Sequence, residues 1–128
     1  MDTTVIDDLK TRYARQISLP EVGEEGQMRL AGKRVAVIGA GGLGSALLPL
    51  LVGAGVGYLS LCDDDSISVS NLPRQTIYTT HEVGRSKAHC AAERLRAANP
   101  HCDITAYSER LTEANAPRLI GEVDLLID

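Results

Sequence analysis

A glycine-rich turn constrains what this chain of 128 residues can fold into. Residues 39–44 read GAGGLG, directly after the apolar run RVAVI and directly before the apolar stretch SALLPLLVGAG. A continuous apolar run is typical of a parallel strand covered on both faces, and the stretch that follows suits a helix buried against a sheet. The turn is therefore expected to connect a strand to a buried helix.

The same alternation continues through the rest of the chain. The sequence predicts further strands over 58–63, 102–107 and 123–128, and further helices over 85–99 and 112–122. Strands joined through helices form parallel sheets with right-handed crossovers. The pattern therefore predicts an α/β fold with a Rossmann-like, doubly wound and mainly parallel sheet.

The pattern also divides the chain into two parts. Residues 1–31 are expected to form an N-terminal helical arm, and residues 32–128 a Rossmann-like domain. The apolar residues of the arm share one helical stripe: Ile6, Leu9, Tyr13 and Ile17. The domain is expected to be incomplete at its C-terminus, since Asp128 is the last residue of a strand-like run. We interpret the sequence as an N-terminal fragment.

Composition narrows the classes of function. A net charge of −4 provides no overall field that attracts a polyanion, so nucleic acid is not expected as a partner. The N-terminus lacks the layout of a signal peptide, and no apolar stretch is long enough to span a membrane. The cysteines form no CxxC pair, so we expect small buried thiols and a cytoplasmic protein: Cys62, Cys90 and Cys102.

The glycines of the turn have separate expected roles. Gly39 permits the sharp turn, Gly41 lets backbone amides approach a phosphate, and Gly44 allows close contact between helix and sheet. The amides at the start of the helix favour an anion, and the P-loop ending GK[ST] is absent. Asp63, about twenty residues further on, is placed to bind a ribose. NAD, FAD and ATP all fit these residues.

The loop after Asp63 separates these ligands. Residues 63–75 read DDDSISVSNLPRQ, and Lys87 follows. Cations and amide side chains around a triphosphate serve phosphoryl or nucleotidyl transfer, whereas hydride transfer has no such need. These residues therefore favour ATP, and the nucleotide-binding domain of an NAD-dependent oxidoreductase remains the alternative.

Seven blocks together resemble the ubiquitin-activating-enzyme-like adenylyltransferases, which include the molybdopterin-synthase (MoeB) and thiamine-pathway (ThiF) activating enzymes. Such enzymes use ATP and Mg²⁺ to adenylate the C-terminal glycine carboxylate of a ubiquitin-like sulfur-carrier protein, and they work as homodimers. The blocks run through nearly the whole chain: RYARQ (12–16), GQMRL (26–30), VIGAGGLG (37–44), AGVGYLSLCDDD (54–65), SNLPRQ (70–75), VGRSKA (83–88) and NPH (99–101).

The resemblance assigns roles to individual residues. It implies that Gly41 and Gly42 lie beside the α-phosphate of ATP, with Asp63 on the ribose. It also implies that Asp65 lies near the phosphates or shapes the loop around them. Gln75 is expected to be a secondary contact.

The cationic residues are the expected catalytic groups. The resemblance places Arg74 and Lys87 on the phosphates, together with Asn71. It also implies that Arg15 reaches the nucleotide of the neighbouring subunit, so that the arm would take part in a dimer.

One part of the resemblance falls outside this sequence. The magnesium ligand of the family is expected beyond Asp128, and its zinc-binding cysteines later still, so no metal ligand is assigned here. A non-catalytic family member that docks a ubiquitin-like protein therefore stays a second alternative.

Overall fold

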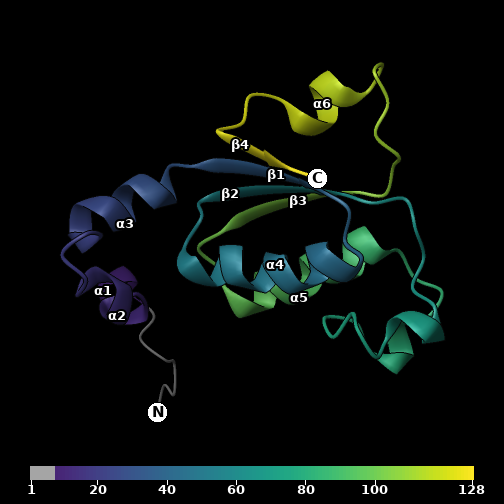
Figure 1. The fold of residues 1–128 in the computed structure, drawn as a ribbon, viewed down its shortest axis with the longest axis horizontal. Helices are drawn as coiled ribbons and strands as arrows, with labels where there is room; N and C mark the ends of the chain where they lie inside the picture. Colours follow the sequence, from purple (N-terminus) through teal and green to yellow (C-terminus); the bar gives the residue numbers. More distant parts are fainter. Residues whose placement is uncertain (1–7) are drawn as a thin grey trace, which may run out of the picture.

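The computed structural model describes residues 8–128, and they form a four-stranded sheet in which every pairing is parallel. The strand order is β3-β2-β1-β4, so β1 lies inside the sheet (Figure 1). The strands are β1 Arg34–Ile38, β2 Tyr58–Cys62, β3 Asp103–Tyr107 and β4 Leu125–Ile127. The Rossmann-like parallel sheet predicted from the sequence is confirmed.

Helices cover the sheet unequally. Helices α4 (Gly42–Ala54) and α5 (Lys87–Ala98) lie side by side on one face, and the short α6 (Ala116–Ile120) lies over the other (Figure 1). The inward face of α5 is the one predicted, with these residues buried: Ala88, Ala91, Ala92 and Leu95. The small side chains on this face let α5 pack closely against the sheet. Because α6 lies over the opposite face, helices cover both faces of the sheet, as expected.

Helix α4 carries the glycine turn at its start. It continues through Pro49, which removes one backbone donor but does not end the helix. It ends at Gly55, which has a left-handed φ of 103° that a residue with a Cβ rarely adopts. The predicted helix is confirmed at both of its ends.

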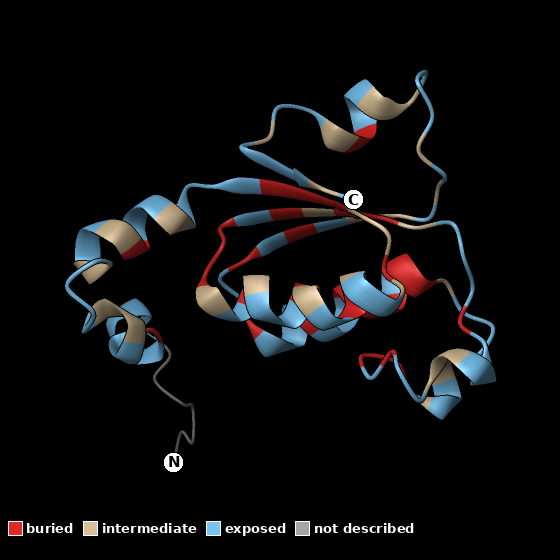
Figure 2. Cartoon of the chain, viewed as in Figure 1, coloured by how far each residue is buried: buried red, intermediate tan, exposed pale blue. Residues whose placement is uncertain are grey.

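The core lies between the sheet and helices α4 and α5 (Figure 2). Its largest fully buried apolar side chains include Val37 and Leu61 from the strands and Leu48 from α4. Burial of such side chains removes apolar surface from water and stabilises each by about 1.5–3 kcal/mol. The two ends of α4 are therefore held against a well-packed layer.

The first part of the N-terminal arm differs from the single amphipathic helix that the sequence predicts there. It consists of α1 (Leu9–Arg12), α2 (Ala14–Ile17) and α3 (Gly23–Ala31), and Ile6 lies outside the described residues. The break falls at Tyr13, which is buried, and whose hydroxyl accepts a hydrogen bond of 2.8 Å from Asn99 Nδ2. The prediction of one continuous helix here is wrong, since Tyr13 has a non-helical ψ of 18° between α1 and α2.

The connection from β2 to α5 contains two short 3-10 helices. They are η1 (Val69–Asn71) and η2 (Thr80–Glu82), and each is stabilised by a capping box. A bridge between Ser66 and Ser86 draws the two ends of this connection together. The loop that follows Asp63 is therefore an ordered segment that begins and ends beside β2.

Candidate functional site

The glycine turn is bound to the strand beside it. The Gly39 N–H donates a hydrogen bond of 2.7 Å to the Cys62 carbonyl at the end of β2, and Gly39 has a φ of 101°. A Cβ on Gly44 would overlap the carbonyl of Gly39. The turn requires glycine at Gly39 for its conformation and at Gly44 for the close approach of helix to strand.

Side chains from two further segments hold Ala40, the residue between the first glycines. Asp63 Oδ2 accepts a hydrogen bond of 2.7 Å from the Ala40 N–H, and Asp63 Oδ1 accepts one of 2.7 Å from the Asp65 N–H. The Tyr78 hydroxyl donates a hydrogen bond of 2.6 Å to the Ala40 carbonyl. Asp63 thus lies against the turn, and its carboxylate already organises two backbone amides there.

The first turn of α4 is open. Within residues 8–128 no side chain caps the helix at Gly41. A Cβ on Gly42 would meet nothing within 4 Å, and one on Gly41 would meet only Gln75 Nε2, at 3.7 Å. Uncapped amides at a helix N-terminus attract anions through their N–H groups and the helix dipole. This end of α4 therefore has the features that favour an anion such as phosphate.

The side chain of Gln75 lies near Gly41, at the start of α4. Its residue is only 3% exposed, and its Oε1 has no hydrogen-bond partner among the described residues. A buried polar atom without a partner is destabilising, and such atoms are commonly satisfied by a ligand or a water. Gln75, predicted as a secondary contact, lies beside Gly41.

Lys87 is the first residue of α5, and its side chain is only 6% exposed. Its Nζ lies 3.8 Å from Asp65 Oδ2, and its N–H donates a hydrogen bond of 3.0 Å to the Asp65 carbonyl. A buried ammonium is costly unless it is paired with negative charge. The pairing with Asp65 links two residues that the sequence analysis placed in one site.

Asn71 and Arg74 lie in the η1 segment. Asn71 Oδ1 accepts hydrogen bonds of 3.0 Å from the Ser68 N–H and 2.9 Å from the Ser68 hydroxyl. The Arg74 side chain is exposed, and its Nη1 lies 3.5 Å from the Ser70 carbonyl. Asn71 therefore shapes the segment, whereas Arg74 has a guanidinium with room to move.

Arg15 does not join these residues in its own chain. It is exposed on α2, and the arm packs at the far end of α4, where Gln16 and Gln27 donate to the Ala54 carbonyl. A helix of 13 residues is about 20 Å long. Arg15 is therefore separated from its own glycine turn by roughly the length of α4.

A hollow of about 330 Å³ opens at the carboxyl ends of β1 and β2, and Gly39, Asp63 and Asp65 line it. The carboxylates of Asp63, Asp64 and Asp65 lie within 4.8 Å of one another. Asp64 and Asp65 are exposed, while both oxygens of Asp63 accept backbone amides. The cluster is accounted for by the loop itself, and we assign no metal ligand to it.

The cysteines have the character of buried thiols. All of them are free and buried. Burial, followed by the nearby charge of Asp63, raises the pKa of Cys62, and burial raises that of Cys90. Burial and then Asp103 raise the pKa of Cys102 to about 11. Since the thiolate is the reactive form, none of these thiols is activated as a nucleophile.

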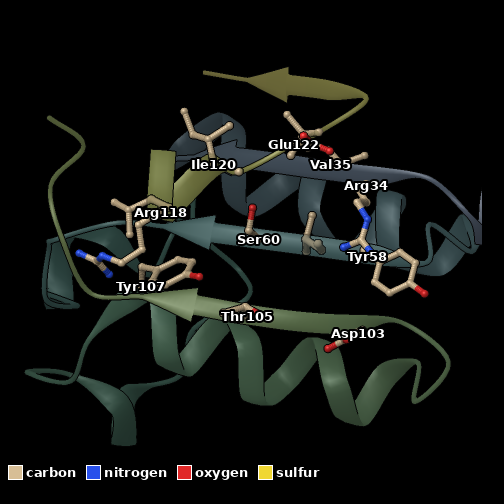
Figure 3. Close-up of a pocket in the computed structure, with 14 residues that line it drawn as sticks. Arg34, Val35, Tyr58, Ser60, Asp103, Thr105, Tyr107, Arg118, Ile120 and Glu122 are labelled. Atoms are coloured by element: carbon tan, nitrogen blue, oxygen red, sulfur yellow. The ribbon is translucent and has the colours of Figure 1, made fainter. Parts of the chain in front are cut away.

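A second hollow, of about 200 Å³, lies on the sheet face beside α6 (Figure 3). Figure 3 shows Arg34 over the ring of Tyr58, at 4.0 Å, and Arg118 beside Tyr107, at 6.0 Å from its ring. None of the predicted site residues lines this hollow. The predicted site and this face are therefore separate.

The model of the ThiF family matches residues 13–128. The chain belongs to the ThiF family. It is 50% identical over 117 residues to the sulfur carrier protein adenylyltransferase of Thermus thermophilus, and 40% identical over 118 residues to a probable molybdopterin-synthase adenylyltransferase of Porphyra purpurea. These matches cover 91% and 92% of the chain but 43% and 31% of the two relatives. The chain thus spans less than half of these relatives.

Solved structures agree with this assignment. The tRNA N6-threonylcarbamoyladenosine dehydratase TcdA of E. coli in complex with ATP matches with a TM-score of 0.86 and 32% identity. The match covers 98% of this chain and 51% of that one. The same protein in complex with AMP matches with a TM-score of 0.80.

The described part of the chain contains no helix with the length and apolar character of a membrane span.

Tyr78 and Arg110 are two described residues near the site that the sequence did not single out. Tyr78 bonds the turn, and Arg110 lines the hollow at the strand ends. Neither belongs to a local pattern that would have singled it out.

Proposed function

We propose that this chain is the nucleotide-binding part of an ATP-dependent adenylyltransferase. Its substrate would be the C-terminal glycine carboxylate of a ubiquitin-like sulfur-carrier protein, as in molybdopterin or thiamine biosynthesis. The observation that carries the proposal is the buried Lys87 paired with Asp65, on the loop whose first residue, Asp63, binds the open turn of α4. The two relatives from Thermus thermophilus and Porphyra purpurea are named adenylyltransferases, which supports this reaction.

In this proposal the two parts of the chain have different tasks. Residues 32–128 bind the nucleotide. The amides of Gly41 and Gly42 contact the α-phosphate, and Asp63 accepts hydrogen bonds from the ribose while it holds the turn. Residues 1–31 form an arm that acts on a neighbouring subunit.

The reaction needs no nucleophile from the protein. A carboxylate oxygen of the carrier attacks the α-phosphorus of ATP, the bond to the bridging oxygen breaks, and pyrophosphate leaves with the electron pair. The product is an acyl adenylate. Lys87 and Arg74 neutralise charge on the departing phosphates, an effect worth about 10²–10³ in rate for one well-placed donor. The raised pKa values of the buried thiols fit a role outside this step.

The residues present fit a nucleotide. Gln75 Oε1 is a buried acceptor without a partner beside Gly41, and a Cβ on Gly42 would fill otherwise empty space. Mg²⁺ would supply further charge neutralisation on the phosphates, and its protein ligand is expected beyond Asp128. A zinc site, where the family has one, is also expected in that later part.

Arg15 has a task only in a homodimer. Arg15 lies about the length of α4 away from the glycine turn of its own chain. We therefore propose that it reaches the nucleotide bound by a second copy of the chain. We therefore expect a homodimeric cytoplasmic enzyme whose protein partner is the sulfur carrier.

The test is pyrophosphate exchange into ATP by the full-length gene product. Exchange is expected with a carrier that ends in glycine, and not with the same carrier lacking its terminal glycine. Binding of ATP and of NAD is measured by calorimetry on the same preparation. Binding of NAD in preference to ATP would instead support the alternative function, the nucleotide-binding domain of an NAD-dependent oxidoreductase.

A third outcome concerns the non-catalytic reading. Carrier binding without exchange, for every candidate carrier, would contradict adenylation and leave a docking protein. The control is Arg85→Met, which removes an exposed cation paired with Glu93 near Lys87 in sequence. It should exchange as the unaltered protein does.

A further inference from the structure

The peptide unit between Ala40 and Gly41 has two polar atoms in different situations. Its carbonyl accepts the hydrogen bond of 2.6 Å from the Tyr78 hydroxyl. Its N–H, on Gly41, finds no acceptor among residues 8–128. The chain has no cis peptide among the described residues, so this carbonyl and this N–H point in opposite directions. Fixing one therefore fixes the other.

We propose that Tyr78 is a positioning residue that sets the plane of the Ala40–Gly41 peptide. By holding the Ala40 carbonyl, Tyr78 turns the Gly41 N–H toward the open end of α4, where a phosphate would accept it. The direction of this N–H is the inference, and its use by ATP rests on the proposed function.

The peptide needs such a restraint because Gly41 offers little resistance to rotation. Glycine populates both signs of φ with similar ease, so a peptide next to it can flip at small cost. The preceding peptide is already held, since the Ala40 N–H donates to Asp63. Without the Tyr78 hydroxyl, one hydrogen bond of this pair is lost and the plane of the second peptide is free.

Tyr78 is well suited to act as a fixed donor. It is 4% exposed and belongs to the core, so its ring has little freedom. Burial, and after it the charge of Asp63, raises the pKa of its hydroxyl above the ordinary value. The hydroxyl therefore keeps its proton at every physiological pH, and the Ala40 carbonyl keeps its donor.

The chain offers a matched control in Tyr13. It is also 4% exposed, and its hydroxyl also takes part in one buried hydrogen bond, of 2.8 Å with Asn99. It lies at the other end of α4, away from the turn. Tyr13→Phe removes an equivalent hydroxyl and reports any effect that comes only from lost stability.

The experiment compares Tyr78→Phe, Tyr13→Phe and the unaltered full-length protein. ATP affinity is measured by calorimetry, and the Gly41 amide is followed by NMR after labelling glycine with ¹⁵N. For Tyr78→Phe we expect ATP to bind about tenfold more weakly, the equivalent of one lost hydrogen bond. The Gly41 amide signal should also shift and exchange faster without nucleotide. Tyr13→Phe should leave the Gly41 amide unchanged.

The outcomes separate the two proposals. If the unaltered protein does not bind ATP, the proposed function fails, while the Gly41 amide still tests the role of Tyr78. If Tyr78→Phe leaves both ATP affinity and the Gly41 amide unchanged, the inference is overturned. Should Tyr78→Phe not fold, Tyr78→Met, which keeps apolar volume without a donor, is measured in the same way.

Discussion

The two ends of helix α4 differ in their hydrogen bonds to side chains. Side chains donate to backbone carbonyls at its C-terminal end, whereas no described side chain accepts from the N–H groups at its N-terminal end. The Ala54 carbonyl accepts from Gln16 and Gln27, and the Val52 carbonyl accepts a hydrogen bond of 2.8 Å from Asn99. At the glycine turn no side chain within residues 8–128 caps the helix. Every helix leaves four N–H and four carbonyl groups unpaired. In the described residues, side chains of this chain bind carbonyls at the C-terminal end of α4, and none binds the N–H groups at its start.

The glycines at the two ends differ in the same way. A Cβ on Gly57 would overlap the carbonyl of Ala31, and one on Gly55 would overlap Gln27. A Cβ on Gly42 would meet nothing within 4 Å. Glycine at the closed end makes room for backbone and side chains of the same chain. At the open end it leaves space that the chain itself does not use.

The largest expected effect is on folding at the closed end. Gly57→Ala should destabilise the protein by about 3 kcal/mol or more, because the new methyl group would force backbone apart in a packed region. Urea unfolding of the full-length protein measures it. A loss below about 1 kcal/mol would mean that this end is not as closed as its contacts indicate.

Loss of the buried cation comes next, and acts on chemistry. Lys87→Met should lower pyrophosphate exchange by about 10²–10³, since one charged donor to the phosphates is removed. Its unfolding free energy should change little, because the methionine fills the same buried space. Arg85→Met is the matched control, with an exposed ion pair worth at most about 1 kcal/mol.

At the closed end, Asn99→Ala should destabilise by about 2–3 kcal/mol. The Tyr13 hydroxyl and the Val52 carbonyl would each lose a buried hydrogen bond. ATP affinity, measured by calorimetry at a temperature where the variant is folded, should stay the same. A large fall in affinity would show that the two ends are coupled through α4.

The next prediction concerns one substitution that should improve stability and weaken ATP binding. Gly42→Ala should raise the free energy of unfolding by about 0.5–1 kcal/mol, as alanine does in a helix, and should still weaken ATP binding. Gly53→Ala, also in α4 and also without neighbours within 4 Å, is the control. It should give the same gain in stability with unchanged affinity. Equal affinity in both variants would contradict a phosphate at the open end.

The smallest expected effect depends on pH. Burial acts to raise the pKa of Glu82, but hydrogen bonds from Thr79 and Cys90 and the charge of Arg94 hold it below its ordinary value. Glu82 therefore stabilises the fold above its unfolded pKa of about 4.3, and this contribution is lost as pH falls through the lower folded pKa.

Glu82→Gln tests this contribution through its capping box with Thr79. The variant should lose up to about 1 kcal/mol at pH 7 and progressively less toward pH 3. The measurement is the urea midpoint of both proteins across that range. A difference that stays constant with pH would mean that the charge of Glu82 has no part in the loss.

Local patterns predicted most of the fold. Apolar runs and glycines gave the strands and α4, since periodicity and left-handed residues are properties of short stretches. The contact made by Tyr13, the residue at which α1 and α2 separate, was not predictable, because its partner Asn99 lies 86 residues away. Secondary structure is predictable here where the chain determines it locally, whereas a contact between distant residues is not.

The same distinction between local and distant determinants applies to the candidate site. The position of Asp63 at the end of β2 followed from the order of strand, helix and strand, and in the structure its carboxylate accepts the Ala40 N–H; its role on a ribose stays a prediction. The pairing of Lys87 with Asp65 depends on how the long loop folds back. The contact of Tyr78 with Ala40 was invisible for the same reason.

The hydrogen bond from Tyr78 also bears on synthesis of the chain. Its partner in the turn, Ala40, lies 38 residues earlier, and Asp63 lies 23 residues after Ala40. A ribosome that has released only the first strand and α4 has therefore released a glycine turn without its final shape. The open end of this helix therefore reaches its final shape well after the helix itself has been made.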